Sequence, residues 1–209
     1  REHQTSWYLA LDQRRVFING GRAGRPPQAI PLADFTLLLA STEEYSLLQP
    51  LRDRCRLTLR FEFLSADDLV ALTRQRGRSL GWAVADEVLL EFARRSRGTP
   101  RLALRLLQAC RRVCRSGAER SIGPDHLRRA CELEGIDALG LGPVEQAYLR
   151  VVAEGTSRLN VIASRLGLPA RTVAEVCEPF LIRVGFVVKD DQGRRELSAE
   201  GRAHLSQGG

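Results

Sequence analysis

The sequence predicts an α/β segment, then a helical domain, and then a small module of helices that ends in a hairpin. Three observations predict this order. An apolar run over 35–40, bounded by turn signals, suits a buried strand of a parallel sheet. From residue 65 the apolar residues recur at helical spacing between capping signals. Beyond residue 143, three short helical patterns precede two short segments, 186–189 and 194–197, that flank a turn at 190–193.

Length and composition set the outer bounds. The 209 residues are 44% hydrophobic and 27% charged, which allows real cores and argues against disorder. The net charge of +7 and a pI near 9.8 favour a polyanionic partner, most simply nucleic acid. The base composition of the genome is the alternative, because Lys189 is the only lysine and nearly all basic residues are arginines.

Five cysteines without a CxxC pair predict buried free thiols in a reducing cytosol, so we expect a cytoplasmic protein. No apolar run reaches the roughly 18 residues of a membrane span, and we expect no membrane partner. The chain contains no methionine and opens on a charged stretch, from which we expect a piece of a longer protein.

The first residues predict a helix over 1–13 followed by a protruding hairpin between Val16 and Leu32. Asn19-Gly20 is a strong turn signal between its two short arms. The Gly/Arg-rich loop could instead cradle a phosphate through its backbone amides. It lacks both the GxxxxGK[ST] spacing and a following helix.

Ser41 and Thr42 follow the predicted strand over 35–40, and the alternating residues 57–63 predict a second strand. Polar groups at the carboxyl end of a parallel strand could position a water or sense a γ-phosphate, although capping of the strand end is the commoner use. No P-loop and no strand ending in an Asp-Glu pair occurs in the sequence. These residues alone therefore cannot split a nucleotide by the P-loop mechanism.

Arg52 and Arg54 stand two residues apart just before the second predicted strand. They could be solvated arginines paired with Asp53 and Glu62. Alternatively, Arg54 reaches a neighbouring subunit's nucleotide, where its planar guanidinium would stabilise charge on the transferring phosphoryl group.

Four helices are predicted between residues 65 and 133, with Ser65 and Thr99 as caps. Gly77 is expected to end the first helix, and Pro100 to lie in the first turn of the third. Arg101 also lies in that turn, where the helix dipole opposes a cation unless an anion binds nearby; a surface ion pair or chance is the alternative.

A glycine-rich linker over 135–142 leads to the last module. The order there is helix, helix, tight turn, helix over 171–184, and a hairpin around 190–193, which is the winged-helix order.

Several motifs in this order resemble RuvB, the hexameric AAA+ motor that drives branch migration of Holliday junctions. They are FTLLLAST, PLRDR, FEF, ARRSRGTPR, EPFLIRVGFV and GRR. The resemblance covers nearly the whole chain and begins downstream of the family's two ATP-binding motifs. It implies the remnant of an α/β AAA+ large ATPase domain over 1–61, an α-helical lid domain over 62–135, and a C-terminal winged-helix domain over 136–209.

The resemblance also implies roles for individual residues. Thr42, with Ser41 beside it, matches the sensor-1 position, and Arg54 matches the arginine finger, with Arg52 as its companion. Arg101 matches the sensor-2 arginine that contacts nucleotide in cis. On the wing, Lys189 and Arg194 fall at DNA-contacting positions, and Arg195 is the adjoining basic residue.

The partners implied are duplex DNA or a Holliday junction, further copies of the chain in a hexameric ring, and a RuvA-like protein at the Val16–Leu32 hairpin. ATP is the implied cofactor, with Mg²⁺ held through a part of the protein not in this sequence. The full protein would be an ATP-dependent DNA helicase or translocase, and the fragment alone is predicted to be inactive. The sequence departs from the family pattern at Cys55, Leu64, Lys189 and Gln192.

The residues alone leave two alternative functions open. One is a non-enzymatic DNA-binding regulator built on the winged helix. Its expected recognition helix carries Glu175 and Glu178 with only Arg171 and Arg183 as basic residues, which is poor for reading bases. The other is a clamp-loader-like AAA+ ATPase.

Overall fold

The computed structural model describes residues 2–18 and 28–207. Its contacts divide the chain into two units, Arg1–Phe61 and Glu62–Gly209. Among the described residues, no helix combines the length and the apolar character needed to cross a bilayer.

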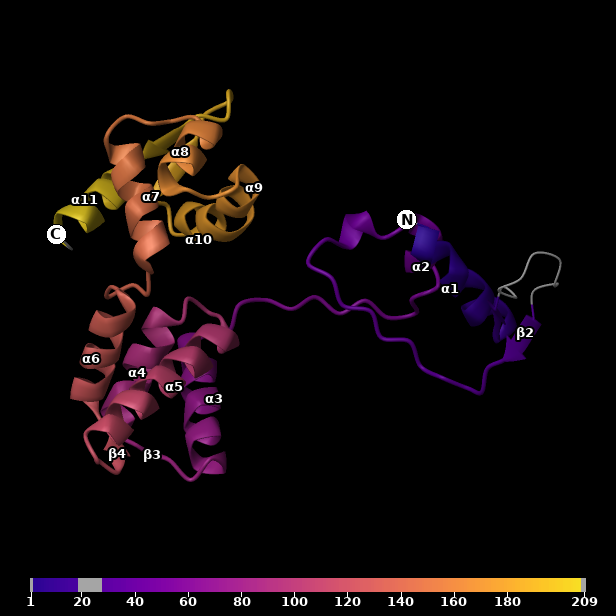
Figure 1. The fold of residues 1–209 in the computed structure, drawn as a ribbon, viewed down its shortest axis with the longest axis horizontal. Coiled ribbons are helices and arrows are strands. Elements are labelled where there is room, and N and C mark those ends of the chain that lie inside the picture. Colours follow the sequence, from indigo (N-terminus) through magenta and orange to yellow (C-terminus); the bar gives the residue numbers. More distant parts are fainter. Residues whose placement is uncertain (1, 19–27, 208–209) are drawn as a thin grey trace. The chain divides into compact units, whose positions relative to one another are not determined.

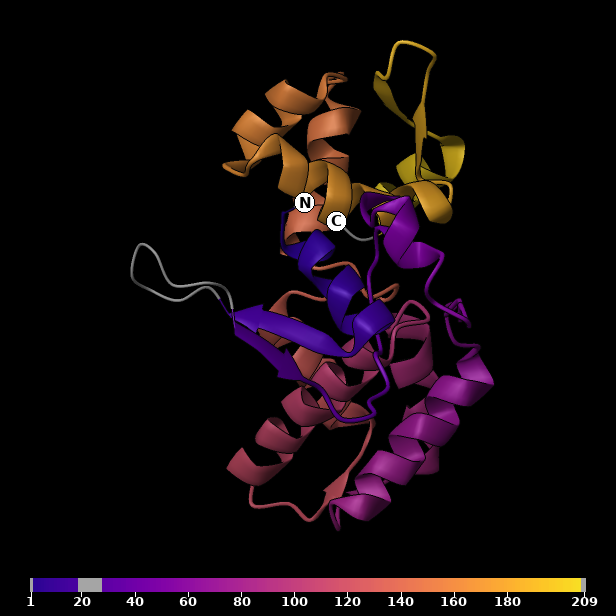
Figure 2. The same ribbon diagram turned by 90° about the vertical axis from the view of Figure 1, so that its right-hand side faces the viewer.

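The first unit begins with helix α1, Glu2–Gln13, and an antiparallel hairpin of β1, Arg15–Ile18, and β2, Gln28–Pro31 (Figure 1). Val16 lies opposite Ile30 in the register, and Figure 2 draws the two strands side by side. The predicted hairpin is therefore confirmed in its two arms. Its loop, on which the phosphate alternative depends, lies outside the described residues.

A 3₁₀ turn η1, Glu44–Ser46, and the short helix α2, Gln49–Arg52, complete the unit. Ala10 on α1 and Leu51 on α2 are both almost fully buried, and the two helices are in contact. This packing fixes the segment that carries the two predicted catalytic arginines against α1.

The two strands predicted at 35–40 and 57–63 are wrong for this structure, which shows no ladder for either run. Their apolar side chains are exposed, including Leu38 at 89% and Phe61 at 93%. A strand of a parallel sheet is stable only when neighbouring strands pair its backbone groups and cover both faces. The described part of the first unit offers these runs no such neighbours.

The second unit starts with the helices that we call the lid. Its helices and the short parallel pair of strands are α3 Ala66–Ser79, β3 Ala83–Val84, α4 Asp86–Arg95, α5 Pro100–Ser116, β4 Ser121–Ile122 and α6 Pro124–Glu134.

The amphipathic α5 supplies much of the lid core, because Leu106, Leu107 and Cys110 are buried on one face. Ser65 caps α3 as predicted, accepting from the Asp68 backbone N–H at 3.1 Å. Gly77 does not end α3, which runs on to Ser79. A Cβ at Gly77 would lie 3.0 Å from Val84 Cγ2, so the glycine instead lets β3 pack close to the helix.

The last elements form the winged-helix module. They are α7 Pro143–Ala153, α8 Leu159–Leu166, α9 Ala170–Thr172, a π-helical turn Val173–Cys177, α10 Glu178–Arg183, β5 Val187–Lys189, β6 Arg195–Leu197 and α11 Ala199–Gln207.

One helix was predicted over 171–184, whereas the structure has a π turn between α9 and α10. Pro179 sits at the start of α10 and has no N–H to donate to the preceding turn, which favours a break in the regular ladder there. The predicted hairpin is confirmed, with Lys189 opposite Arg195 in its register. The closing helix α11 was not predicted.

The five cysteines are free, as predicted. Four are buried, and burial, together with the neighbouring Cys131, raises the pKa of Cys110 to about 12. Cys55 is exposed, and the prediction of burial is wrong for this residue because its segment is not covered within the first unit.

Candidate nucleotide and nucleic-acid contact sites

Arg54 is held by α1 of its own unit. Its Nε donates to Asp12 Oδ1 at 2.8 Å, one terminal nitrogen donates to Asp12 Oδ2 at 2.5 Å, and the other donates to the Pro50 carbonyl at 2.7 Å. The guanidinium also lies 4.9 Å from the ring centroid of Tyr8. This bidentate pair lowers the pKa of Asp12 and raises that of Arg54. The arginine is thus presented in a fixed orientation with 31% of its side chain exposed.

Arg52 points to a different set of groups. It donates to Gln49 Oε1, and its guanidinium lies 5.2 Å from the ring centroid of Tyr45. Its Nε is buried without a hydrogen-bond partner among the described residues. The two neighbouring arginines therefore do not share one site in this structure.

Ser41 and Thr42 lie on the extended segment before η1. Ser41 Oγ accepts from the Glu43 backbone N–H at 3.0 Å, which is a local turn contact. Thr42 lines an open pocket of about 580 Å³ together with Tyr45 and Arg60. Within the described residues no hydrogen bond joins either hydroxyl to Arg54.

Arg101 is exposed in the first turn of α5. In the described part of the chain it has no hydrogen bond or ion pair. Thr99 precedes the helix but makes no side-chain cap bond, so the amide groups of this turn are not capped by it. An exposed cation beside uncapped amides gives a surface that an anion can contact.

The wing is organised by the buried carboxylate of Glu178 on α10. Lys189 Nζ lies 2.6 Å from Glu178 Oε2, Arg195 Nε donates to Oε1 at 2.8 Å, and the Tyr148 hydroxyl donates to Oε1 at 3.0 Å. Burial alone would raise the pKa of Glu178, but these hydrogen bonds outweigh it and lower the pKa. Burial and the Glu178 charge raise the pKa of Tyr148.

The three basic residues predicted on the wing therefore differ in their exposure and in their ion pairs. Arg195 is packed into the Glu178 cluster with 11% of its side chain exposed, and Lys189 is paired with the same carboxylate but 35% exposed. Arg194 is exposed, and its side chain makes no ion pair in the part of the chain that the structure describes. Arg194 is thus the residue of the three most accessible to a phosphate.

The expected recognition helix offers little for reading bases. Arg171 bonds to Glu175 at 2.7 Å. Arg183 donates to the Arg97 carbonyl at 2.8 Å and stacks on Phe63. With these arginines engaged, contacts to a duplex from this module would fall mainly on backbone phosphates.

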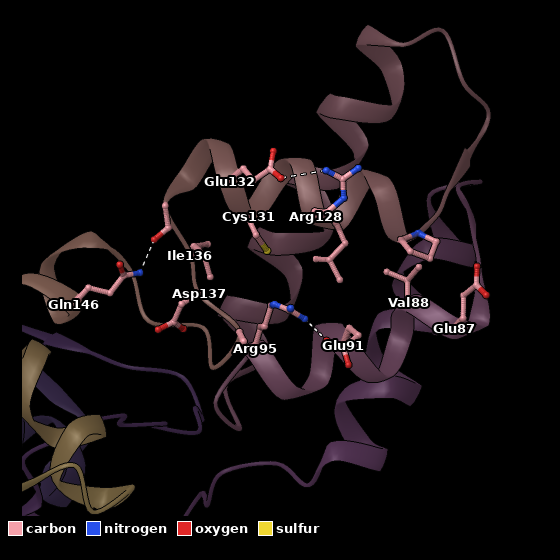
Figure 3. Close-up of a pocket in the computed structure, with 14 residues that line it drawn as sticks. Glu87, Val88, Glu91, Arg95, Arg128, Cys131, Glu132, Ile136, Asp137 and Gln146 are labelled. Atoms are coloured by element: carbon pink, nitrogen blue, oxygen red, sulfur yellow. Dashed lines mark hydrogen bonds and ion pairs between the residues drawn. The ribbon is translucent and has the colours of Figure 1, made fainter. Parts of the chain in front are cut away.

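The lid contains a pocket of about 570 Å³ between α4, α6 and the linker that follows (Figure 3). Apolar side chains such as Val88 and Leu127 line it together with Glu91, which is paired with Arg95. Two ion pairs line it, Glu91 with Arg95 and Arg128 with Glu132, and among the described residues no cluster of His, Cys, Asp or Glu could hold a metal ion.

Sequence reasoning missed Asp12 and Glu178 as organisers of the predicted arginines. Asp12 is 42 residues from Arg54, so no local spacing could reveal the pair. Glu178 stands directly before Pro179 in a mostly apolar stretch, and a charge there is a signal for a buried pair.

Two family models match the chain in succession. One describes the RuvB AAA lid domain and matches residues 64–137. The other describes the RuvB C-terminal winged helix domain and matches residues 138–206.

Curated relatives carry the description Holliday junction branch migration complex subunit RuvB. That from Picosynechococcus is 34% identical over 203 residues, covering 95% of this chain and 56% of the relative. Those from Saccharopolyspora erythraea and Mycobacterium tuberculosis are each 37% identical over 193 residues, covering 90% of this chain and 54% and 56% of the relative. The chain spans just over half the length of these relatives.

The solved structures give the same likeness. A mutant of Thermotoga maritima RuvB superposes with a TM-score of 0.79 at 28% identity, covering 97% of this chain and 65% of that chain. The Thermotoga maritima RuvB Holliday junction branch migration motor superposes with a TM-score of 0.69 at 30% identity, covering 77% and 55%.

Proposed function

We propose, from the premise that this chain belongs to the RuvB family through its lid and winged-helix domains, that it is part of an ATP-driven motor acting on Holliday junctions. The succession of the two family models over 64–206 is the observation that carries the proposal. The chain would supply an arginine for a neighbour's nucleotide, a lid sensor and contacts to duplex DNA. The P-loop and the Mg²⁺ site would belong to another part of the protein, because this sequence contains no P-loop and no strand ending in an Asp-Glu pair.

Arg54 is proposed to act in trans on a neighbouring subunit's ATP. Arg54 donates two parallel hydrogen bonds to the Asp12 carboxylate. The same planar pair of N–H donors could engage two oxygens of a phosphate. Asp12 would hold the guanidinium in place until a triphosphate competes for it, and the arginine would then stabilise charge on the transferring group. Arg101, exposed at the start of α5, would contact nucleotide within its own subunit.

The wing is proposed to hold duplex DNA by its phosphates. Arg194 would make the most accessible contact and Lys189 a second one. Arg195 would act mainly by holding the wing to Glu178. Such contacts give affinity that depends on salt and not on base sequence.

The β1–β2 hairpin is proposed to meet a RuvA-like partner. Val16, Phe17, Ile18 and Ile30 are each between 39% and 54% exposed, so the hairpin presents an apolar surface. A homo-oligomeric, hexameric ring and a cytoplasmic location are parts of the same proposal. We propose the activity of an ATP-dependent DNA translocase for the whole protein and none for these 209 residues alone.

The test is Arg54→Ala in the full-length protein. We expect ATP turnover to fall by about 10³-fold or more, because an arginine finger acts on the transition state, with nucleotide affinity nearly unchanged. Titration with a fluorescent nucleotide and steady-state turnover measure the two quantities. Arg56→Ala, an exposed arginine two residues on, is the matched control and should retain wild-type turnover. Loss of nucleotide binding, or unchanged turnover, would contradict the assigned role.

A further inference from the structure

Arg97 occupies an unusual position between α4 and α5. Its φ is +54°, in the left-handed region that non-glycine residues seldom adopt, and only 11% of its side chain is exposed. A strained backbone and a buried guanidinium both oppose folding unless specific partners compensate. The contacts of Arg97 must therefore offset both of these costs.

The Arg97 side chain binds the winged-helix module at several places. One terminal nitrogen donates to Glu145 Oε1 at 2.8 Å, in the first turn of α7. The other donates to the Gly140 carbonyl in the linker, and the guanidinium lies 4.5 Å from the ring centroid of Phe180 on α10. A single residue of the lid thus holds the linker and two helices of the next module.

The backbone of the same turn also contacts the winged-helix module. The Arg97 carbonyl accepts from Arg183 at 2.8 Å, and the Arg183 guanidinium lies 3.5 Å from the ring centroid of Phe63. Gly98 packs on Phe63 so closely that an added Cβ would lie 2.7 Å from Phe63 Cβ. The segment that enters the lid, the Arg97–Gly98 turn and the end of α10 therefore form one layered contact.

The linker between the two modules is also fixed. A Cβ at Gly140 would lie 2.0 Å from the Arg95 carbonyl oxygen, so only glycine allows this approach. Gln146 donates to the carbonyls of Gly135 and Leu141, each at 2.8 Å, and His204 of α11 lies 2.8 Å from Asp137 (Figure 3 shows Gln146, Asp137 and Arg95). The glycine content of this segment reflects close packing and not freedom of movement.

We propose that Arg97 is a positioning residue that fixes the winged helix to the lid, so that a displacement of the turn carrying Arg101 moves the winged helix with it. Arg97 is four residues from Arg101 and begins the turn that leads into α5. The mechanical part stands on the contacts alone. The transmission of a nucleotide signal rests on the function proposed above for Arg101.

The mechanical part is tested on the 209-residue chain by ¹⁵N relaxation. The wild-type lid and winged helix should tumble with one rotational correlation time. Arg97→Ala should give two, with the shorter belonging to the winged helix. Arg94→Ala is the matched control, because Arg94 lies on α4, is 62% exposed and pairs only with Glu91 among the described residues. A single shared correlation time in Arg97→Ala would overturn the proposal.

A second variant tests the same contact and keeps the proposal testable if Arg97→Ala fails to fold. Glu145→Gln leaves the strained turn untouched. It removes the charge that faces Arg97 and leaves one acceptor oxygen in place of the two that receive the Arg97 guanidinium and the Gly142 N–H. It should also separate the two correlation times, while the amide spectrum of each module stays folded. Retention of one correlation time in Glu145→Gln and in Phe180→Ala alike would overturn the role of these contacts.

Transmission is tested in the full-length protein with Glu145→Gln. ATP turnover without DNA should stay within about twofold of wild type, because Glu145 contacts no proposed nucleotide residue. Junction movement per ATP hydrolysed should fall about tenfold. Unchanged movement per ATP would overturn transmission through Arg97. A wild-type protein that neither hydrolyses ATP nor moves junctions would instead refute the proposed function and leave the relaxation result intact.

Discussion

At the scale of single residues, several basic side chains at the candidate sites are oriented by a carboxylate. Asp12 orients Arg54, Glu145 engages Arg97, and Glu178 gathers Lys189 and Arg195. A guanidinium held by two hydrogen bonds loses little further freedom when it meets a second anion. Fixed arginines of this kind suit a protein whose proposed ligands are phosphates.

Glu178 gives the clearest stability prediction, because its side chain is fully buried and interacts with donors on three residues, Tyr148, Lys189 and Arg195. Glu178→Gln should lower the free energy of unfolding at pH 7 by about 3 kcal/mol, the cost of removing one partner from a buried ion pair. Chemical denaturation of the 209-residue chain measures the change. Glu196→Gln on β6 is a control, because Glu196 is exposed and should change stability little.

The same residue predicts a pH dependence. The pKa of Glu178 is lower in the folded chain than its ordinary value of 4.5. The unfolded state therefore binds this proton more readily, and the stability contributed by Glu178 is complete above about pH 4.5 and is lost as the pH falls through the lowered folded pKa. The difference between wild type and Glu178→Gln should accordingly shrink below that pH. A difference that stays constant from pH 7 to pH 3 would contradict the assignment.

At the scale of elements, local signals predicted most of the helices and both hairpins, but failed for the two runs expected to be strands of a parallel sheet. The lid helices follow from caps and apolar spacing that lie within each segment, as Ser65 and Asp68 illustrate for α3. The hairpin arms follow from a turn signal between two short apolar runs. The runs at 35–40 and 57–63 carry the right pattern, but a strand also needs a neighbouring strand, and their own residues do not encode that neighbour.

The residues of the candidate sites also fall into those that local sequence motifs mark and those that only the structure reveals. Arg54, Arg101 and Lys189 could be named because motifs mark them, whereas Asp12 and Arg97 emerged only from contacts between distant segments. The acidic partners are separated from the arginines by 42 and 48 residues, respectively. Sequence spacing therefore shows which cation is available but not what holds it.

The cap of α3 can be tested at this scale. Ser65 Oγ accepts from the Asp68 N–H, and Asp68 in turn faces the Ser65 N–H. Ser65→Ala should lower the free energy of unfolding by about 1 kcal/mol, because a helix N–H loses its acceptor. Ser79→Ala, an exposed serine at the other end of α3, is the control. Equal denaturation midpoints for the two variants would rule out a contribution from the cap.

At the scale of the whole molecule, the net charge of +7 is spread over many surfaces. Much of it is balanced locally, as on α6, where Arg128 and Arg129 both pair with Glu132. A high pI alone therefore does not identify the face that meets a polyanion. That face is better indicated by a cation whose side chain has no ion pair, and Arg194 on the wing is exposed and has none among the described residues.

Ion-paired and unpaired cations can be distinguished by the binding of a random DNA duplex to the 209-residue chain, measured over a range of salt concentrations. Arg194→Ala should weaken binding and lower the slope of log K against log salt by about 0.9, the value for one lost phosphate contact on B-DNA. Arg129→Ala removes the same formal charge from the lid, and should leave that slope unchanged because Arg129 is paired away from the wing. If both variants lower the slope equally, DNA senses the overall charge of the chain, and the wing has no special part in binding.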